Sequence, residues 1–291
     1  PQIDVAGLSA VQELVAQQEL DVLVFNDIGL SQHTWFLAFG RFAPVQCLTL
    51  SNGMTSGLPT IDYYVSTIGS QPGLAAQDKY TEALVLLDSL YFTLAHPLAD
   101  LPVREYHDHM QNFEFAQVTK ASFRRRLGLP PNSNVYVCFQ GLFKIHPMFD
   151  DTVLEILRLD PQAVIVFMHD PNKPQWSKLL MARFGSAARS LSFSDPEAGA
   201  QALTALRSER VQFAPKLPHD DYVKFVMAAD VHLDPFPFGG GLTTAELLGL
   251  SLPVVTLPGQ HRSGSLTSAM YARMEVNDLV AHNASHYARI A

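Results

Sequence analysis

Cysteine is scarce in this sequence, with only Cys47 and Cys138 among 291 residues. Both lie in apolar runs typical of buried strands, so we interpret them as free thiols, which suits a reducing compartment. The sequence also lacks the roughly 18 consecutive apolar residues that a membrane span requires. Its first residues contain neither the basic segment nor the apolar core of a secretion signal. We therefore expect a cytoplasmic protein without a membrane span.

Clustered positive charge is also missing. The chain has 20 Lys and Arg residues against 28 Asp and Glu, for a net charge of -8. The one basic run, Arg124-Arg125-Arg126, is interpreted as a solvated helix face, and this balance argues against a nucleic-acid partner. Among the 11 histidines, the densest groups are His107-Asp108-His109 and His219-Asp220-Asp221. Neither matches a zinc pattern such as H-E-x-x-H, so we expect no metal.

Short apolar runs alternate with helical patterns along the chain. Strands are predicted at residues 21–25, 45–50, 61–66, 83–87, 135–139, 163–168, 211–213, 231–233 and 253–257. Helices are predicted at residues 7–20, 31–41, 149–158, 176–184 and 220–229, with another that begins at Thr243. Residues 190–205 are expected to form a surface excursion. The alternation is most regular in the second half, where it predicts an α/β fold with a parallel sheet and right-handed crossovers.

The best candidate for a linker that interrupts this alternation is Pro130-Pro131-Asn132-Ser133-Asn134. Proline and asparagine clusters of this kind mark turns and linkers. We therefore expect a domain boundary between residues 108 and 134, with one domain at residues 1–120 and a second at 121–291.

The most distinctive stretch runs from residue 228 to residue 259. Its strand is followed by three glycines, Gly239 to Gly241, then by Thr243 and Thr244 at the start of a helix. The first amides of a helix have no internal partner and attract anions, and glycines allow a phosphate to approach the backbone. Glu246 is placed to accept hydrogen bonds from ribose hydroxyls, and Asp234 is expected to bond the turn. The alternative is a glycine-rich connection whose threonines only cap the helix.

Four patches together resemble the catalytic region of the protein O-GlcNAc transferase and SPINDLY O-fucosyltransferase family, including bacterial members with upstream tetratricopeptide repeats. They are residues 43–46, 55–63, 139–147 and 230–259. The resemblance implies a GT-B architecture, in which two Rossmann-like domains face each other across a cleft. The N-terminal domain is expected to be incomplete in this chain, and the C-terminal domain to bind the nucleotide.

The resemblance also implies the reaction. It is an inverting, metal-independent transfer of a sugar from a UDP- or GDP-linked donor to a protein Ser/Thr or another acceptor, such as a glycan. No cofactor besides the donor is expected, and tetratricopeptide repeats are expected upstream in the full-length protein. By position, Lys144 corresponds to the lysine that contacts the donor diphosphate, and its alternative is an ordinary surface lysine. The other donor-contacting positions are Gly240, Gly241, Leu242, Thr243, Thr244, Glu246, Lys216, Leu217, His219 and Tyr222.

Two departures from the family pattern concern histidines. Leu242 stands where animal O-GlcNAc transferases have a histidine, and Gly29 where SPINDLY-type members have one. Candidates for a general base are Asp27, which we prefer, His33 and Asp62, although His33 also suits a helix face and Asp62 a structural anchor. The departures leave two alternatives open: a weak or inactive nucleotide-binding relative, and a sugar-nucleotide epimerase.

Overall fold

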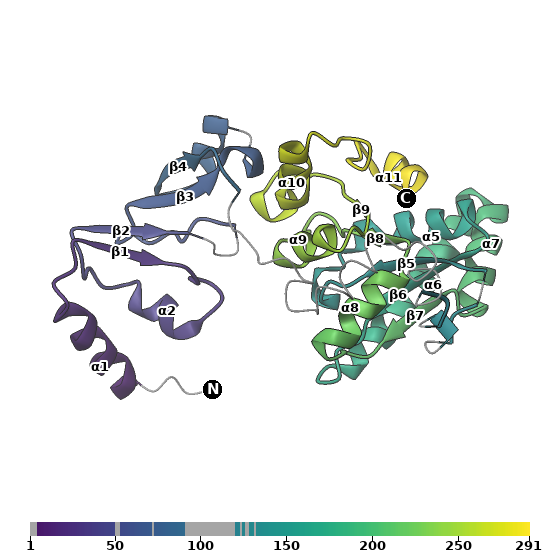
Figure 1. Cartoon of the computed structure of the whole chain (residues 1–291), viewed down its shortest axis with the longest axis horizontal. Coiled ribbons are helices and arrows are strands. Elements are labelled where there is room, and N and C mark those ends of the chain that lie inside the picture. The colour runs from purple at the N-terminus through teal and green to yellow at the C-terminus, as the bar shows by residue number, and fades with distance from the viewer. Residues whose placement is uncertain are drawn as a thin grey trace, which may run out of the picture. The chain divides into compact units, whose positions relative to one another are not determined.

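The computed structural model describes residues 5–49, 53–71, 73–90, 120–122, 124–125, 128–130 and 132–291. The chain divides into two compact units (Figure 1). Unit 1 comprises residues 1–93 and 260–265, and unit 2 comprises residues 94–259 and 266–291. The expected boundary at residue 120 adjoins residues 91–119, which lie outside the described residues. His107-Asp108-His109 also lies outside them.

Unit 1 is built on a four-stranded parallel sheet in the order β1-β2-β3-β4. The strands are β1 (Val22–Phe25), β2 (Val45–Leu48), β3 (Tyr63–Thr67) and β4 (Ala83–Leu87). The helices are α1 (Val5–Ala16) and α2 (Gln32–Leu37), with the 3-10 turns η1 (Ile68–Ser70), η2 (Gly73–Lys79) and η5 (Arg262–Gly264). All four strands of this half of the chain were predicted.

The two faces of the unit 1 sheet differ in burial. Side chains on one face join a core of Phe25, Leu48, Tyr64 and Leu84. Large apolar side chains on the other face are exposed: Val22, Val24, Tyr63, Val85 and Leu87. Parallel sheets are normally covered on both faces. Unit 1 therefore departs from that rule.

Unit 2 contains a five-stranded parallel sheet in the order β7-β6-β5-β8-β9. Its strands are β5 (Asn134–Cys138), β6 (Ala163–Met168), β7 (Val211–Ala214), β8 (Val231–Leu233) and β9 (Val254–Val255). The chain adds β6 and β7 on one side of β5, then β8 and β9 on the other. The strand order therefore reverses between β5 and β8, and ligands of open α/β sheets bind beyond the carboxyl ends of the strands at such a point.

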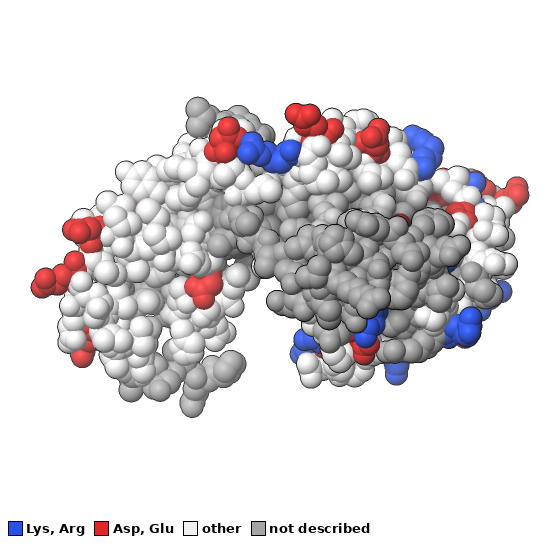
Figure 2. Space-filling view, in the orientation of Figure 1, with Lys and Arg blue, Asp and Glu red and all other residues white. Residues whose placement is uncertain are grey.

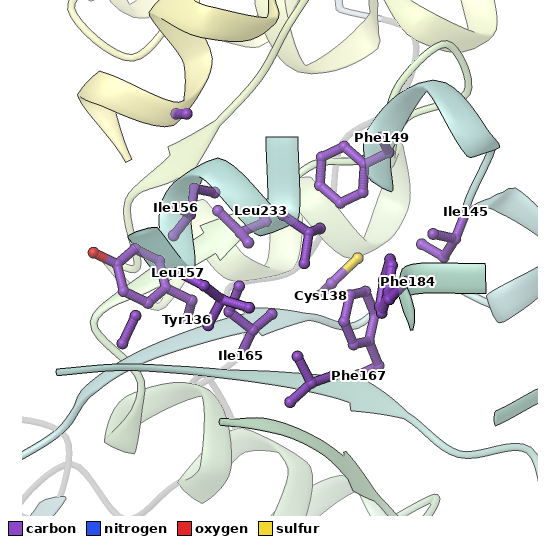
Figure 3. Close-up of a cluster of buried hydrophobic side chains, with 14 of the residues drawn as sticks. Tyr136, Cys138, Ile145, Phe149, Ile156, Leu157, Ile165, Phe167, Phe184 and Leu233 are labelled. Carbon is purple, nitrogen blue, oxygen red and sulfur yellow. The ribbon is translucent and has the colours of Figure 1, made fainter. Parts of the chain in front are cut away.

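Both faces of the unit 2 sheet are buried. Along β5, Val135 and Val137 join one hydrophobic cluster, and Tyr136 and Cys138 join the other. Figure 3 shows the second cluster, where Cys138 lies among aromatic and aliphatic side chains. The helices are α5 (Asp150–Leu159), α6 (Pro174–Ser194), α7 (Pro196–Arg207), α8 (His219–Ala228), α9 (Leu242–Gly249), α10 (Leu266–Met274) and α11 (Ala284–Ile290). Two 3-10 turns, η3 (Leu142–Lys144) and η4 (Pro147–Phe149), follow β5.

The expectation of a surface excursion at residues 190–205 is wrong, because this segment holds the end of α6 and most of α7. The Asp195 side chain accepts a hydrogen bond from the Ala198 amide at 3.0 Å and caps α7, and Pro196 occupies its first turn. Aspartate followed by proline is a recognised helix start.

No described helix is both long and apolar enough to cross a membrane. On the face seen in Figure 2, the described Lys and Arg side chains are scattered and do not form one broad basic surface.

Candidate functional site

The candidate site lies at the carboxyl ends of β5 and β8, where the strand order of unit 2 reverses. Tyr136 pairs with Val231 and Val137 with His232, so these two strands run side by side. The segment after β5 carries Gln140 and η3, and the segment after β8 carries the glycine-rich turn. The topology therefore brings together two stretches that are about 90 residues apart in the sequence.

Asp234 organises the turn after β8. Its buried carboxylate accepts hydrogen bonds from the Gly240 amide at 2.6 Å and from the Thr256 hydroxyl at 2.8 Å. The expectation that Asp234 bonds the following turn is confirmed. Burial raises the pKa of Asp234, while the hydrogen bonds it accepts and the nearby charge of Lys144 oppose that shift.

The glycines of the turn are required by close packing. A Cβ atom on Gly239 would lie 2.8 Å from Asp234 Oδ2. On Gly240 it would lie 2.3 Å from Thr244 Oγ1 and 2.7 Å from Gln140 Nε2. Such distances are far inside van der Waals contact, so a side chain at either position would have to displace these neighbouring side chains or the turn itself.

The turn leads into the N-terminus of α9. Gly241 occupies the N-cap position, and no side chain caps the helix there. The threonines therefore do not supply the N-cap of α9. Thr243 is partly exposed, whereas Thr244 is fully buried with its hydroxyl 3.2 Å from that of Thr267. The first amides of α9 remain suited to an anion, and Leu242 is 58% exposed at the first helical position.

Lys144 is directed at the glycine-rich turn. Its Nζ lies 2.9 Å from Gln140 Oε1, 3.4 Å from the Gly239 carbonyl oxygen and 4.8 Å from the centre of the Phe238 ring. The alternative of an ordinary surface lysine does not fit these contacts. Burial lowers the pKa of Lys144, and the negative charge of Asp234 opposes the shift.

The contacts of Lys144 leave its charge available. Both hydrogen-bond acceptors are neutral, and among the described residues no carboxylate forms an ion pair with Lys144. Gln140 is only 2% exposed, and its Nε2 has no hydrogen-bond partner in the described part of the chain. Gln140 was not predicted from the sequence, because nothing local marks a glutamine after a strand as the partner of a lysine four residues later. Together these groups form a site with surplus donors.

A second group of predicted residues gathers where α8 begins. His219 Nδ1 lies 3.7 Å from Glu246 Oε1, and the Tyr222 ring packs against Phe139 with ring centres 5.3 Å apart. Burial raises the pKa of Tyr222, and the Glu246 carboxylate raises it further. The structure thus brings His219, Tyr222 and Glu246 together. In the preceding loop, Lys216 is exposed and Leu217 packs against the core.

The candidate bases lie in unit 1. The Asp27 carboxylate accepts a hydrogen bond from the Thr34 hydroxyl at 3.1 Å, and His33 is exposed on α2. Asp62 forms an ion pair with Arg41 at 2.5 Å and also accepts from the Gln46 amide at 2.8 Å. The Arg41 hydrogen bonds hold the pKa of Asp62 below its ordinary value. This environment favours the structural interpretation of Asp62.

Unit 1 also contains a buried carboxylate that the sequence did not reveal. Glu82 accepts hydrogen bonds from the Thr55 hydroxyl at 2.7 Å and from the Ser56 amide at 2.7 Å. Burial alone raises the pKa of Glu82, but these hydrogen bonds outweigh it and hold the pKa below its ordinary value. Glu82 therefore fixes the loop at residues 55–57. In the described part of the chain, no three His, Cys, Asp or Glu side chains are grouped to hold a metal ion.

Comparison with curated proteins gives relatives along nearly the whole chain. Two are named "Probable UDP-N-acetylglucosamine--peptide N-acetylglucosaminyltransferase SPINDLY". The one from Solanum lycopersicum is 26% identical and the one from Arabidopsis thaliana 25% identical, each over 99% of this chain. The chain spans only 27% and 28% of their respective lengths.

Comparison with solved structures supports the fold. A mutant O-GlcNAc transferase of Thermobaculum terrenum matches with a TM-score of 0.69 and 26% identity, over 97% of this chain and 46% of that one. Anabaena HepE in complex with UDP-glucose matches with a TM-score of 0.57 and 15% identity, over 97% of this chain and 70% of that one. These matches show the GT-B class of α/β fold. Residues 101–291 match the model of glycosyl transferase family 41, and because this match covers more than half of the sequence, the chain belongs to glycosyl transferase family 41.

Proposed function

We propose that this chain carries the catalytic region of a glycosyltransferase that takes a sugar from a nucleotide-sugar donor bound in unit 2. The observation that carries the proposal is the position of Lys144. Its ammonium contacts the Gly239 carbonyl oxygen, and Gly239 lies just before the start of α9, which no side chain caps. Glycosyl transfer releases a nucleoside diphosphate, so the site must stabilise negative charge that develops on the leaving group.

The donor diphosphate binds between Lys144 and the first turn of α9 in this proposal. Lys144 supplies a full charge that no carboxylate of the described residues pairs with directly. The amides of Gly241, Leu242 and Thr243 supply oriented donors at the positive end of the helix dipole. Thr244 is buried, and it acts by packing under Gly240 rather than by touching the ligand.

The nucleoside occupies the neighbouring group at the start of α8. Glu246 accepts hydrogen bonds from the ribose hydroxyls, and His219 and Tyr222 lie beside it to face the base. The exposed Lys216 and the packed Leu217 complete the loop around the base. UDP and GDP are the leading candidates. The relatives reported above carry UDP-N-acetylglucosamine in their names, and the resemblance seen in the sequence implies a UDP- or GDP-linked donor.

The reaction is proposed to invert the sugar, to need no metal and to use no cofactor besides the donor. Asp27 is the proposed base, with His33 as the second candidate. The acceptor is a protein Ser/Thr hydroxyl or a glycan, and tetratricopeptide repeats upstream are proposed to present it. Substituting Asp27→Asn should lower kcat while leaving UDP or GDP affinity unchanged, because Asp27 lies outside unit 2.

Leu242 supports a second candidate, a relative that binds nucleotide but transfers poorly. An exposed leucine at the first position of α9 offers neither charge nor a hydrogen bond to the sugar. Binding of UDP or GDP without detectable transfer from the matching nucleotide-sugars would favour this candidate. Conversion of the donor sugar with release of free diphosphate, and no transferred product, would favour an epimerase.

The test begins with thermal unfolding in the presence of UDP, GDP, dTDP and their sugars, because a ligand of the native state raises its stability. The Lys144→Ala variant should lose transfer and bind the preferred diphosphate about 10- to 100-fold more weakly, as expected for a lost charge-assisted contact. Lys178→Ala, at an exposed position of α6, is the matched control and should behave as wild type. Unchanged turnover in Lys144→Ala would remove Lys144 from the site.

A further inference from the structure

One peptide group lies between the two charged side chains of the site. The Gly240 amide donates to Asp234 Oδ1 at 2.6 Å, and the Gly239 carbonyl oxygen lies 3.4 Å from Lys144 Nζ. These two atoms belong to the same peptide bond. Because a trans peptide is planar, its N–H and C=O point in opposite directions. Asp234 and Lys144 therefore hold opposite edges of one plane.

This plane has only one favourable orientation. If it were flipped, the Gly239 carbonyl would face the Asp234 carboxylate and the Gly240 N–H would face the Lys144 ammonium. Both contacts would then be repulsive. Both observed contacts involve a charged group, but the Gly240–Asp234 hydrogen bond measures 2.6 Å and the Lys144–Gly239 contact 3.4 Å, so Asp234 is the stronger of the two restraints. The Thr256 hydroxyl holds the other oxygen of the carboxylate and fixes its orientation.

We propose that Asp234 is a positioning residue for donor binding: by holding the Gly239–Gly240 peptide plane, it presents the Gly239 carbonyl to Lys144 and keeps the ammonium at the start of α9. The proposal rests on the proposed function for the identity of the ligand, a nucleoside diphosphate. We call the arrangement in which Asp234 and Lys144 hold the two edges of the Gly239–Gly240 peptide the clamp. It is a property of the free protein, so its effect on Lys144 can be measured without any ligand.

Among the residues that the structure describes, three other titratable groups interact with this pair. Cys138 of β5, Tyr271 of α10 and Tyr287 of α11 interact with Asp234, and Cys138 also with Lys144. Burial raises the pKa of Cys138 to about 12 and raises the pKa of both tyrosines, so all three are neutral near pH 7. Asp234 is thus the charge that supports the protonated form of Lys144 against its burial.

The experiment uses Asp234→Asn, which keeps the shape of the side chain and removes its charge. In the free protein, Lys144 is followed by NMR after reductive methylation, with its signal assigned by its absence in Lys144→Arg. The apparent pKa of Lys144 should fall in Asp234→Asn, because the nearby negative charge of Asp234 supports the protonated form of the lysine. Affinity for UDP or GDP at pH 7 should fall about tenfold.

Two further variants complete the test. Thr256→Val removes one hydrogen bond from the same carboxylate but keeps its charge, so the Lys144 titration should stay as in wild type. Gly240→Ala keeps the carboxylate but puts a methyl group against Thr244 Oγ1 and Gln140 Nε2, so the turn or these two side chains must shift and affinity should fall at least tenfold without loss of the Asp234 charge. If Asp234→Asn does not fold, the affinity of Gly240→Ala tests the inference in its place.

An unchanged Lys144 titration in folded Asp234→Asn would overturn the inference, as would tighter nucleotide binding in that variant or wild-type affinity in Gly240→Ala. If wild type binds neither UDP nor GDP while the Lys144 titration still shifts, the proposed function fails and the clamp stands.

Discussion

A single histidine in the core of unit 2 couples the stability of this protein to pH. His232 is fully buried on β8, and its Nε2 accepts a hydrogen bond from the Phe139 amide at 3.2 Å. The proton of the neutral ring is therefore on Nδ1, which has no partner among the described residues. Burial lowers the pKa of His232 from 6.5 to about 3. Its ring stays neutral in the folded state throughout the physiological range.

This shift predicts a loss of stability in acid. Below pH 6.5 the unfolded chain binds a proton that the folded chain does not, so stability falls as the pH drops from 6.5 toward 3. At pH 5 the loss amounts to about 2 kcal/mol relative to pH 7. In His232→Gln, whose amide oxygen can accept from Phe139, that part of the pH dependence should disappear. Urea unfolding at pH 7 and pH 5 measures it.

The exposed His33 provides the control, since His33→Gln should retain the wild-type difference between the two pH values. Equal losses of stability in wild type and His232→Gln would show that His232 does not titrate on unfolding.

Residues whose role follows from their neighbours in the sequence were predictable. Asp234 was expected to bond the turn, because it ends a strand directly before prolines and glycines. Gln140 and His232 were not identified, because each acquires its role from a partner on another strand or loop. In the sequence, His232 is one more residue of an apolar run. Its role becomes visible only with the Phe139 amide, which donates a hydrogen bond to it.

At the scale of secondary structure, Arg183 of α6 forms hydrogen bonds to both the start of α5 and the segment after Lys144. From α6, its Nε donates to Asp150 Oδ2 at 2.7 Å and its Nη2 to Asp150 Oδ1 at 2.8 Å, which anchors the start of α5. Its Nη2 also donates to the Ile145 carbonyl at 2.7 Å, directly after Lys144. Burial raises the pKa of Asp150, and the Arg183 charge opposes that shift. Arg183 thus supports the segment that carries the candidate lysine.

Removing Arg183 should be costly because Asp150 would remain buried without its partner. The Arg183→Met variant should lose about 3 kcal/mol of unfolding free energy, as for other broken buried ion pairs. The double variant Arg183→Met/Asp150→Leu should lose less, because no unpaired charge is left. Urea unfolding of both variants tests this, and a double variant less stable than the single one would contradict it.

Element positions followed the apolar pattern closely where that pattern was strong. The predictions at residues 83–87 and 163–168 coincide with β4 and β6. The prediction for residues 190–205 failed because small and polar residues dominate there. The buried face of α7 consists mainly of alanines such as Ala198, Ala202 and Ala205. Alanine adds little to a hydrophobic pattern although it is the strongest helix former.

At the scale of the whole molecule, the predicted donor-contacting residues all belong to unit 2, and the three candidate bases, Asp27, His33 and Asp62, belong to unit 1. The alternation of strands and helices was sufficient to predict the parallel sheet of the second half, and the family resemblance added the expectation of a second Rossmann-like domain. It did not predict that residues 260–265 group with unit 1, nor that the unit 1 sheet exposes Val22, Val24 and Leu87. Contacts between segments far apart in sequence decide both features, and periodicity does not encode them.

The assignment of the donor-contacting residues to unit 2 predicts where a bound nucleotide slows amide hydrogen exchange. Saturating UDP or GDP, whichever binds, should slow exchange most at residues 139–145 and 239–244. At 100 times its dissociation constant a ligand adds about 2.7 kcal/mol to the stability of the state that binds it. Exchange followed by mass spectrometry measures the effect, with Lys144→Ala as the control that should show little protection. Protection confined to β1–β4 would place the nucleotide in unit 1 instead.

The packing around Gly240 also limits what evolution and protein engineering can change here. Protein atoms already occupy the space of a methyl group at this position, so even alanine does not fit without rearrangement. In a library that samples all amino acids at positions 239 and 240 and selects for activity, glycine should be the survivor at both. Leu242, two residues further on and 58% exposed, should accept many different side chains without loss of the fold, which makes it the position at which to alter the proposed activity.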